Sequence, residues 1–234
     1  MPPLKWIFLD AGNTLVHIDF EFLAHTLAAH GIASSIEALR QAEYGARAVV
    51  DTPDLVTRSS DRDRWEIYFG FIMNRVGATE PELVRRLSAA FRRRQAEKNL
   101  WRIPDPEAAA VLATLKAAGY RLACISNSDG SVRRVLREGG LEPFLEFVID
   151  STEVGVEKPD PRIFLDALER AGAAPVEAVY VGDVFYVDVI GARAAGMTPI
   201  FLDPVGRLLE ERVARIRALS ELPACMKALA PGPG

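Results

Sequence analysis

The chain has 234 residues, a formal net charge of −4 and 49% apolar residues. This length fits one large domain or a core domain with a smaller insertion, and it can bury a sizeable core. A mildly acidic chain is poorly suited to nucleic acid, whose phosphates select basic surfaces. No apolar stretch is long enough to span a bilayer. We therefore expect neither a nucleic-acid nor a membrane partner.

The first residues, MPPLKWIFLD, lack the features of a secretory signal, because Asp10 interrupts a short apolar run. The two cysteines, Cys124 and Cys225, lie in apolar surroundings without a metal-type spacing. Buried free thiols are typical of a reducing compartment. These features favour a cytoplasmic protein, and they leave a monomer and a homodimer both open.

Five short apolar runs are typical of buried strands, and they lie at residues 5–10, 120–128, 146–151, 178–183 and 198–203. From residue 104 onward these runs alternate with helical patterns. This alternation predicts an α/β fold with a Rossmann-like, doubly wound parallel sheet. Right-handed crossovers would place the carboxyl ends of all strands at one edge, where ligands bind in such sheets.

Two helices in this second part have matching start and stop signals. One pattern runs from Asp105 to Gly119 and the other from Asp160 to Gly172, each with a proline directly after the aspartate. Aspartate is a good N-cap, proline fits the first turn, and glycine ends helices well. We expect both aspartates to cap their helices.

Residues 17–103 break the rhythm of strand and helix. They contain no convincing strand and predict amphipathic helices at 19–30, 34–50, 61–76 and 80–100. The sequence therefore predicts an α/β core domain at residues 1–16 and 104–234. A smaller, all-helical cap domain would occupy residues 17–103.

Polar residues that could take part in catalysis or binding follow four of the predicted strands. In chain order they are Asp10, then Ser126 with Asn127, then Lys158 before Pro159, and finally Asp183 with Asp188 five residues later. Because the strands are parallel, all of these residues would lie at the same edge of the sheet.

This constellation resembles the haloacid dehalogenase-like (HAD) hydrolase superfamily. The resemblance covers the whole chain in order and spacing, including the helical insertion. Its most specific part is Lys158-Pro159 followed by Gly182-Asp183 and Asp188, and then by the small pairs Gly191-Ala192 and Ala195-Gly196. The motif around Asp10 alone would be a weak signal.

The resemblance implies a phosphatase of small phosphorylated molecules that forms an aspartyl phosphate on Asp10. It also implies Mg²⁺ as cofactor, since this ion prefers hard oxygen ligands. The metal would be held by the Asp10 carboxylate, the backbone carbonyl of Gly12 and Asp183. Asp188 would hold the waters of the metal or orient Lys158.

The same resemblance assigns the phosphate contacts. The Lys158 ammonium would neutralise both the nucleophile and the phosphate, which makes it the second catalytic residue. Ser126 and Asn127 would bind phosphate oxygens through the serine hydroxyl and backbone N–H groups. Thr14 would fix the first loop by hydrogen bonds of its hydroxyl. Asn13, where the family usually has glycine, is expected to adopt a positive φ angle.

Gly12 is a departure from the phosphatases of this family, which carry a second acid at this position. That acid protonates the leaving oxygen and then activates water, and such help is worth about 10²–10⁴-fold. Glycine keeps the backbone carbonyl for the metal but can transfer no proton. His17 is a candidate substitute with a suitable ordinary pKa, although a hinge histidine without a catalytic part is the more common case.

Three branches of the family lack the second acid. The metal-free 2-haloacid dehalogenases have an aromatic residue at the Gly12 position and do not keep the Gly-Asp pair, so Asp183 argues against them. The phosphonatases have a small residue there but need a cap lysine, and the insertion has only Lys98, at its far end. A phosphatase-like protein of low or altered activity remains, as does a binding or regulatory module without turnover.

Overall fold

The computed structural model of the chain describes residues 3–207 and 212–229. It divides into two compact units, residues 1–17 with 103–234 and residues 18–102. The chain crosses between them at β2 (Val16–Ile18) and β3 (Trp101–Pro104), which pair as a two-stranded sheet. The sequence predicts no strand between residues 17 and 103, and this is wrong at both ends. Strands of three and four residues are too short to show a periodic pattern.

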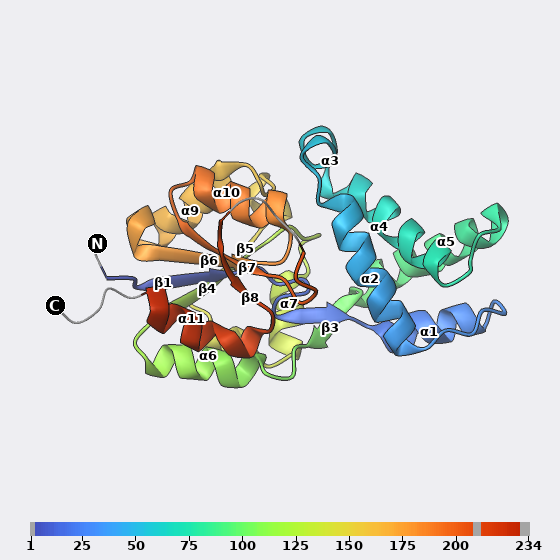
Figure 1. Ribbon diagram of the computed structural model, residues 1–234, viewed down its shortest axis with the longest axis horizontal. Coiled ribbons are helices and arrows are strands. Elements are labelled where there is room, and N and C mark those ends of the chain that lie inside the picture. The colour runs from blue at the N-terminus through green and yellow to red at the C-terminus, as the bar shows by residue number, and fades with distance from the viewer. Residues whose placement is uncertain (1–2, 208–211, 230–234) are drawn as a thin grey trace. The chain divides into compact units, whose positions relative to one another are not determined.

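The larger unit is built on a six-stranded parallel sheet in the order β5-β4-β1-β6-β7-β8 (Figure 1). Its strands are β1 (Trp6–Leu9), β4 (Arg121–Ser126), β5 (Val148–Asp150), β6 (Ala178–Gly182), β7 (Thr198–Leu202) and β8 (Ala214–Ile216). The predicted Rossmann-like α/β fold is confirmed. The edge strand β8 was not predicted, because its three residues include an exposed arginine.

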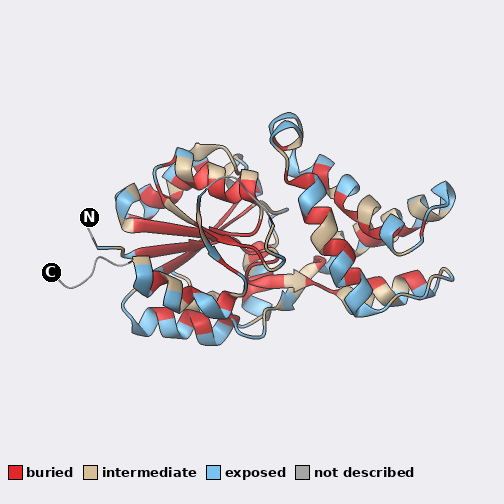
Figure 2. Ribbon diagram, viewed as in Figure 1, coloured by how far each residue is buried: buried red, intermediate tan, exposed pale blue. Residues whose placement is uncertain are grey.

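Helices cover both faces of this sheet. Helices α6 (Ala108–Ala117) and α11 (Leu222–Leu229) lie on one face, and α9 (Pro161–Ala171) and α10 (Ile190–Ala194) lie on the other (Figure 1). The remaining elements are α7 (Val132–Glu138), α8 (Ser151–Val154) and the single turns η1 (Glu142–Phe144), η2 (Pro175–Glu177), η3 (Phe185–Val189) and η4 (Leu219–Glu221). Figure 2 shows most residues of the central strands as buried, which agrees with their apolar sequences.

Helices α6 and α9, for which the sequence predicts an aspartate N-cap, differ in whether that aspartate caps the helix. Asp160 caps α9 by accepting from the amide of Arg162, and Gly172 ends it with a φ angle of +61°. The cap expected at Asp105 is wrong, because α6 begins only after Glu107. Asp105 Oδ1 instead accepts from the Glu107 amide at 2.9 Å, in a turn that precedes the helix. Aspartate favours such side-chain turns as strongly as it favours caps.

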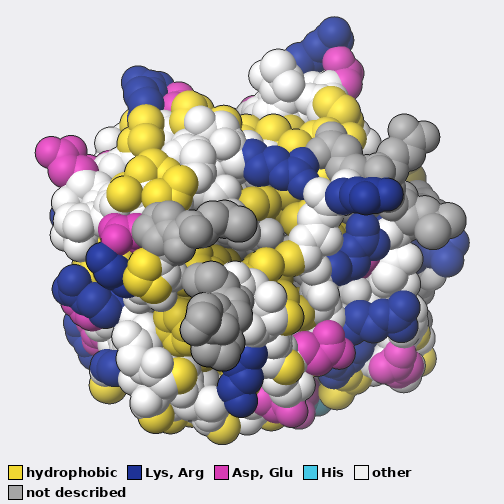
Figure 3. All heavy atoms as spheres, turned by 60° about the vertical axis from the view of Figure 1, so that its left-hand side comes forward, with side chains coloured by type: hydrophobic (Ala, Val, Ile, Leu, Met, Phe, Trp, Pro, Cys, Tyr) yellow, Lys and Arg dark blue, Asp and Glu magenta, His cyan; other side chains and the backbone are white. Residues whose placement is uncertain are grey.

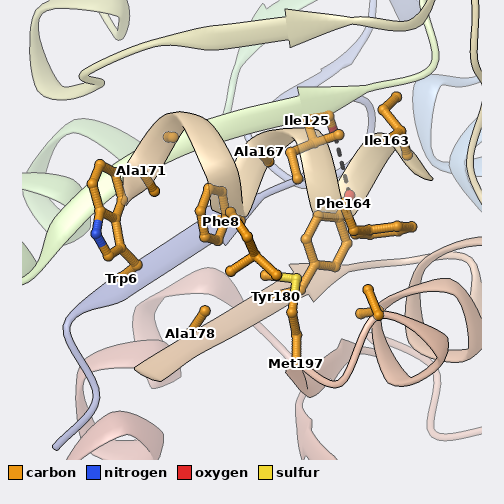
Figure 4. Close-up of a cluster of buried hydrophobic side chains, with 14 of the residues drawn as sticks. Trp6, Phe8, Ile125, Ile163, Phe164, Ala167, Ala171, Ala178, Tyr180 and Met197 are labelled. Atoms are coloured by element: carbon orange, nitrogen blue, oxygen red, sulfur yellow. Dashed lines mark hydrogen bonds between the residues drawn. The ribbon is translucent and has the colours of Figure 1, made fainter. Parts of the chain in front are cut away.

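One large apolar cluster joins the sheet to α9 (Figure 4). Trp6 and Phe8 of β1 stack with ring centroids 5.5 Å apart. Phe164 of α9 meets Tyr180 of β6 edge to face, with centroids 5.0 Å apart. All four residues are buried, so close packing holds β1 and β6 against α9.

The smaller unit is helical and has its own apolar core. Its helices are α1 (Phe20–Ala28), α2 (Ile36–Val50), α3 (Pro53–Arg58), α4 (Asp61–Arg75) and α5 (Pro81–Lys98). Four agree with the predicted ranges, and the six-residue α3 was missed. Buried Glu43 accepts from Arg47 Nη2 at 2.8 Å and from the Tyr68 hydroxyl at 2.5 Å. This network joins α2 to α4.

The surface and the thiols carry few functional signals. On the face shown in Figure 3, basic side chains lie interspersed with acidic ones. No helix within residues 3–207 and 212–229 is long and apolar enough to cross a membrane. Cys124 is buried, whereas Cys225 is only half-buried.

Candidate active site

The polar residues singled out in the sequence meet at the carboxyl edge of the six-stranded sheet. Asp10 directly follows β1, Ser126 ends β4, and Asp183 directly follows β6. Lys158 comes from the loop between α8 and α9, and Asp188 lies in the turn η3. Parallel strands with crossover connections bring such distant segments to one place.

The ammonium group of Lys158 joins three of these segments. Its Nζ atom lies 2.6 Å from Asp10 Oδ1, 2.8 Å from Asp188 Oδ1 and 2.7 Å from the hydroxyl oxygen of Tyr180. The Lys158 side chain is only 2% exposed. An ammonium has three hydrogens to donate, and these three acceptors take them all. A cation is therefore fixed directly against the candidate nucleophile.

Burial and charge set the protonation states in this cluster. Burial would lower the pKa of Lys158, but Asp10 and Asp188 outweigh it and raise this pKa above its usual value. Burial raises the pKa of Asp10 to about 6, although the attraction of Lys158 opposes this shift. Burial and the neighbouring carboxylates also raise the pKa of Tyr180 well above its usual value. Near neutral pH, Lys158 is therefore a cation, Asp10 an anion and Tyr180 a neutral phenol.

Asp188 is held by contacts on both of its oxygens. Oδ1 accepts from Lys158, and Oδ2 accepts from the backbone amide of Val184 at 3.0 Å. A Cβ atom on Gly182 would lie 2.4 Å from Asp188 Cγ. Only glycine therefore fits before Asp183, because any side chain would displace the carboxylate that holds Lys158.

Three buried carboxylates form a group that could hold a metal ion. Asp10, Asp183 and Asp188 each offer one oxygen, and these oxygens lie within 4.8 Å of one another. Three carboxylates against one ammonium leave an excess of negative charge that a cation would offset. Hard oxygen donors of this kind fit Mg²⁺. Because both oxygens of Asp188 are already engaged, Asp10 and Asp183 are the better direct ligands.

The loop after Asp10 is a tight turn. The carbonyl of Ala11 accepts from the amides of Leu15 and Val16 at 2.8 and 2.9 Å. Asn13 has a φ angle of +54°, in the left-handed region expected for it. The loop therefore keeps its shape with asparagine where glycine is usual.

Gly12 and Thr14, the other two residues of this loop, differ in whether they make contacts that hold the loop. The backbone of Gly12 forms a bridge with Val16, which holds its peptide in place. The hydroxyl of Thr14 is buried and has no hydrogen-bond partner among the described residues. The loop-fixing hydrogen bond expected of Thr14 is therefore wrong, and backbone contacts hold the turn instead.

Asn127 makes contacts that the sequence did not predict. Its Oδ1 accepts from the backbone amide of Lys158 at 2.8 Å, and its Nδ2 donates to the Lys158 carbonyl at 2.9 Å. The side-chain amide thus clamps the loop that carries the lysine. Ser126 Oγ makes only a long contact, 3.4 Å, with the carbonyl of Asn127. Its hydroxyl is therefore free to turn toward another acceptor.

His17 has a partner of its own. Its Nε2 atom lies 2.9 Å from Asp105 Oδ2, and the Asp105 amide donates to the carbonyl of Leu15 at 2.9 Å. The imidazole thus ties β2 to the segment that follows β3. This contact supports the interpretation of His17 as a structural residue at the point where β2 and β3 pair.

Tyr180 belongs to the site, and sequence reasoning missed it. In the run AVYVG it has the pattern of an ordinary core residue. Side chains alternate along a strand, so Tyr180 shares a face with Gly182, which directly precedes Asp183. That parity was the only available signal.

Two relatives of known name match different shares of the chain. The glyceraldehyde 3-phosphate phosphatase of Methanopyrus kandleri is 36% identical over 136 residues, which are 57% of each chain. The chain thus spans little more than half the length of that phosphatase. (S)-2-haloacid dehalogenase 1 of Pseudomonas sp. strain CBS-3 is 29% identical over 235 residues, 95% of this chain and 96% of that one.

A similar solved structure and a matching family model add to these two relatives. A HAD hydrolase from Bacillus subtilis has a similar structure, with a TM-score of 0.71 and 18% identity over 96% of this chain and 99% of that one. The family model described as haloacid dehalogenase-like hydrolase matches residues 4–196, which include every candidate site residue from Asp10 to Asp188. This chain belongs to the haloacid dehalogenase-like hydrolase family.

Proposed function

We propose that this chain is a Mg²⁺-dependent phosphatase that acts on a small phosphorylated metabolite through an aspartyl phosphate at Asp10. The observation that carries this proposal is the buried cluster in which Lys158 joins Asp10 to Asp188, with Asp183 alongside. The phosphatase relative supports the reaction type over the part that it matches. The aldehyde substrate in the name of that relative is not assigned to this chain.

Each residue of the candidate site has its own role in the proposed reaction. An oxygen of Asp10 attacks phosphorus, and the bond from phosphorus to the leaving oxygen breaks in line. Water then attacks the phosphorus of the aspartyl phosphate, which releases inorganic phosphate and restores the Asp10 carboxylate. Lys158 holds Asp10 in place and offsets the negative charge that gathers on the phosphoryl group. The Ser126 hydroxyl and the Asn127 backbone N–H bind phosphoryl oxygens, while the Asn127 side chain positions Lys158.

Mg²⁺ would be held by the Asp10 carboxylate, the Gly12 carbonyl and Asp183, and when bound it would neutralise charge on the phosphoryl oxygens. Asp188 is a support for Lys158 in this proposal. From the place of the insertion in the chain, we also propose that residues 17–103 act as a cap that selects the substrate.

Gly12 decides which substrates are turned over fastest. Without an acid at this position, the leaving oxygen must depart with little protonation. Acyl and aryl phosphates have weakly basic leaving groups and need the missing acid least. We therefore propose substrates of this chemical class, with slow turnover of simple alkyl phosphates.

A panel of phosphate esters with and without Mg²⁺ tests this proposal. We expect turnover of an aryl phosphate that requires Mg²⁺, together with a phosphorylated enzyme that survives denaturation in acid and carries its phosphate on Asp10. Binding of a phosphate mimic without hydrolysis of any ester would instead favour a binding module. Gly12, which can transfer no proton, is the observation that favours this alternative.

A second candidate function is metal-free dehalogenation of 2-haloacids, favoured by a dehalogenase relative that covers 95% of the chain. In that reaction Asp10 would attack carbon and displace halide. Asp183 argues against it, because burial of three carboxylates beside one ammonium is costly unless a further cation offsets their charge. Release of chloride from 2-chloropropionate in the presence of a chelator would establish this function, and its absence would remove it.

A further inference from the structure

The phenol of Tyr180 lies at the centre of the large apolar cluster but ends in the polar site. Tyr180 lies in the middle of β6, paired with Phe8 of β1 on one side and Pro199 of β7 on the other. The residue is 0% exposed, and its ring packs against Phe164 (Figure 4). The ring therefore cannot move without disturbing the sheet.

The hydroxyl of Tyr180 has three polar neighbours. It accepts from Lys158 Nζ at 2.7 Å, and it lies 3.1 Å from Asp188 Oδ1 and 3.1 Å from the carbonyl oxygen of Ile125. The contact with Ile125 is the dashed line in Figure 4. An ammonium can only donate, so the single phenol proton is left for Asp188 or Ile125. The oxygen thus has a fixed orientation toward Lys158.

Packing does not explain this hydroxyl. A phenylalanine would fill the same volume and would avoid the cost of burying a polar atom. The phenol oxygen adds a third hydrogen-bond acceptor for the Lys158 ammonium, which also binds the carboxylates of Asp10 and Asp188. Lysine has a flexible four-carbon stem, so its head group is placed only by what it touches.

We propose that Tyr180 is a positioning residue that holds the Lys158 ammonium against Asp10 during phosphoryl transfer. This inference rests on the proposed function, in which Lys158 offsets the charge on the phosphoryl group. The phenol oxygen anchors Nζ from the side of the core, while Asp10 and Asp188 bind its other two hydrogens. Without the oxygen, the ammonium loses one of its three contacts and can shift away from the position in which it faces the reacting atoms.

The test compares Tyr180→Phe with Tyr68→Phe in the full chain. Tyr68 is a matched control, because it is also buried and its hydroxyl also binds a buried carboxylate, that of Glu43. With an aryl phosphate and saturating Mg²⁺, Tyr180→Phe should lower kcat by about tenfold to a hundredfold, as expected for a misplaced group. KM should change less than about twofold, whereas Tyr68→Phe should leave kcat within about twofold.

A second readout is independent of turnover. The chain has five lysines, and Lys5, Lys98, Lys116 and Lys227 are exposed while Lys158 is buried. A nuclear magnetic resonance spectrum of lysine ammonium groups should therefore show one slowly exchanging signal in the wild-type protein. Tyr180→Phe should speed its exchange with water at least about tenfold, and Tyr68→Phe should leave it unchanged.

These two readouts separate the inference from the proposed function. If the wild-type protein hydrolyses no phosphate ester, the proposed function fails, and the exchange of the Lys158 signal still decides whether Tyr180 holds the ammonium. If Tyr180→Phe keeps both the slow signal and the wild-type kcat, the inference is overturned. A melting curve by circular dichroism checks that each variant is folded. If Tyr180→Phe does not fold, the wild-type spectrum alone decides, since no slow ammonium signal would overturn the inference.

Discussion

Lys158 Nζ lies 2.6 Å from Asp10 Oδ1, so the cation and the proposed nucleophile form one buried ion pair. The same ammonium lies 2.8 Å from Asp188. Removing one member of a buried pair leaves the other without its counter-charge, which is strongly destabilising. Here, however, the cluster has more anions than cations, so its members are not equivalent. Loss of Lys158 should harm the fold far more than loss of Asp10.

Asp10→Asn should abolish phosphatase turnover, by at least about a thousandfold, without lowering stability. Burial raises the pKa of Asp10 to about 6, so the folded chain holds this proton better than the unfolded chain does. The group therefore costs stability as the pH rises from about 4 to about 6, and this cost persists at pH 7. In chelator at pH 7, the variant should be as stable as the wild-type chain or more stable by about 1 kcal/mol in urea unfolding.

Asp150→Asn is the matched control for this change. Asp150 also ends a parallel strand, is buried, and has its pKa raised by burial. Its Oδ1 accepts from the Thr152 amide, a cap that asparagine can keep. Turnover should stay within about twofold. Activity that survived Asp10→Asn would show that the nucleophile is another residue.

The fold could be predicted from the sequence because its main strands are continuous apolar runs and most of its helices have clear ends. Short elements could not be predicted, since β2, β3 and β8 have only three or four residues each. The candidate site was largely predictable for a different reason. Asp10 and Asp183 directly follow buried strands, Lys158 lies in a loop between two helices, and parallel topology brings such segments together at one edge.

What the sequence could not supply were the contacts between residues far apart in the chain. The side chain of Asn127 clamps the backbone of Lys158, 31 positions later. The hydroxyl of Tyr180 lies against the same lysine from 22 positions away. Neither residue type predicts these partners, because asparagine after a strand suggests a turn and tyrosine within one suggests core.

Mg²⁺ should stabilise the folded chain, and Asp183→Asn should remove most of that effect. A ligand at a hundred times its dissociation constant adds about 2.7 kcal/mol to the free energy of unfolding. We therefore expect a clear rise in Tm with Mg²⁺ for the wild-type chain and little rise for the variant. Asp19→Asn removes a buried carboxylate of the helical unit but can keep the cap of α1, so it should respond like wild type. An equal rise in Asp183→Asn would exclude Asp183 as a ligand.

Gly12→Asp should increase turnover selectively for substrates with poor leaving groups. An acid at this position can protonate the leaving oxygen, so alkyl phosphates should gain up to about 10²–10⁴-fold in kcat/KM, which reports the step that forms the aspartyl phosphate. Aryl phosphates with acidic phenols should gain little in kcat/KM, and a plot of log kcat/KM against the leaving-group pKa should become flatter. Gly12→Asn has nearly the same size but carries no acid, so it should leave the slope steep. An equal gain in both variants would contradict a proton-transfer role.

His17→Gln should alter stability and leave kcat within about twofold. His17 binds Asp105 at 2.9 Å at the strand crossing, and a partly buried contact of this kind contributes about 0.5–1 kcal/mol. Burial opposes the shift, but the contacts of Asp105 with His17 and the Glu107 amide lower the pKa of this carboxyl. Its stabilisation is therefore complete above the ordinary carboxyl pKa and is lost as the pH falls through the lowered one.

A double-mutant cycle with Asp105→Asn, followed by urea unfolding at pH 7 and at acid pH, measures this coupling. The coupling should shrink at acid pH as Asp105 becomes protonated. A selective loss of kcat for poor leaving groups in His17→Gln would instead identify the histidine as the missing acid.

Gly182→Ala should destabilise the chain and nearly abolish turnover, because the new methyl group would lie 2.4 Å from Asp188 Cγ. The carboxylate would have to move, and Lys158 would lose a partner at 2.8 Å. We expect a loss of about 2–4 kcal/mol in unfolding free energy, as for overpacking combined with a broken buried contact.

Gly70→Ala is the opposite case, since nothing lies within 4 Å of the added carbon in helix α4. It should gain about 0.5–1 kcal/mol and keep full activity, because alanine is the better helix former. If Gly182→Ala were as active and stable as Gly70→Ala, the tight contact between Gly182 and Asp188 could not be what holds Lys158 in place.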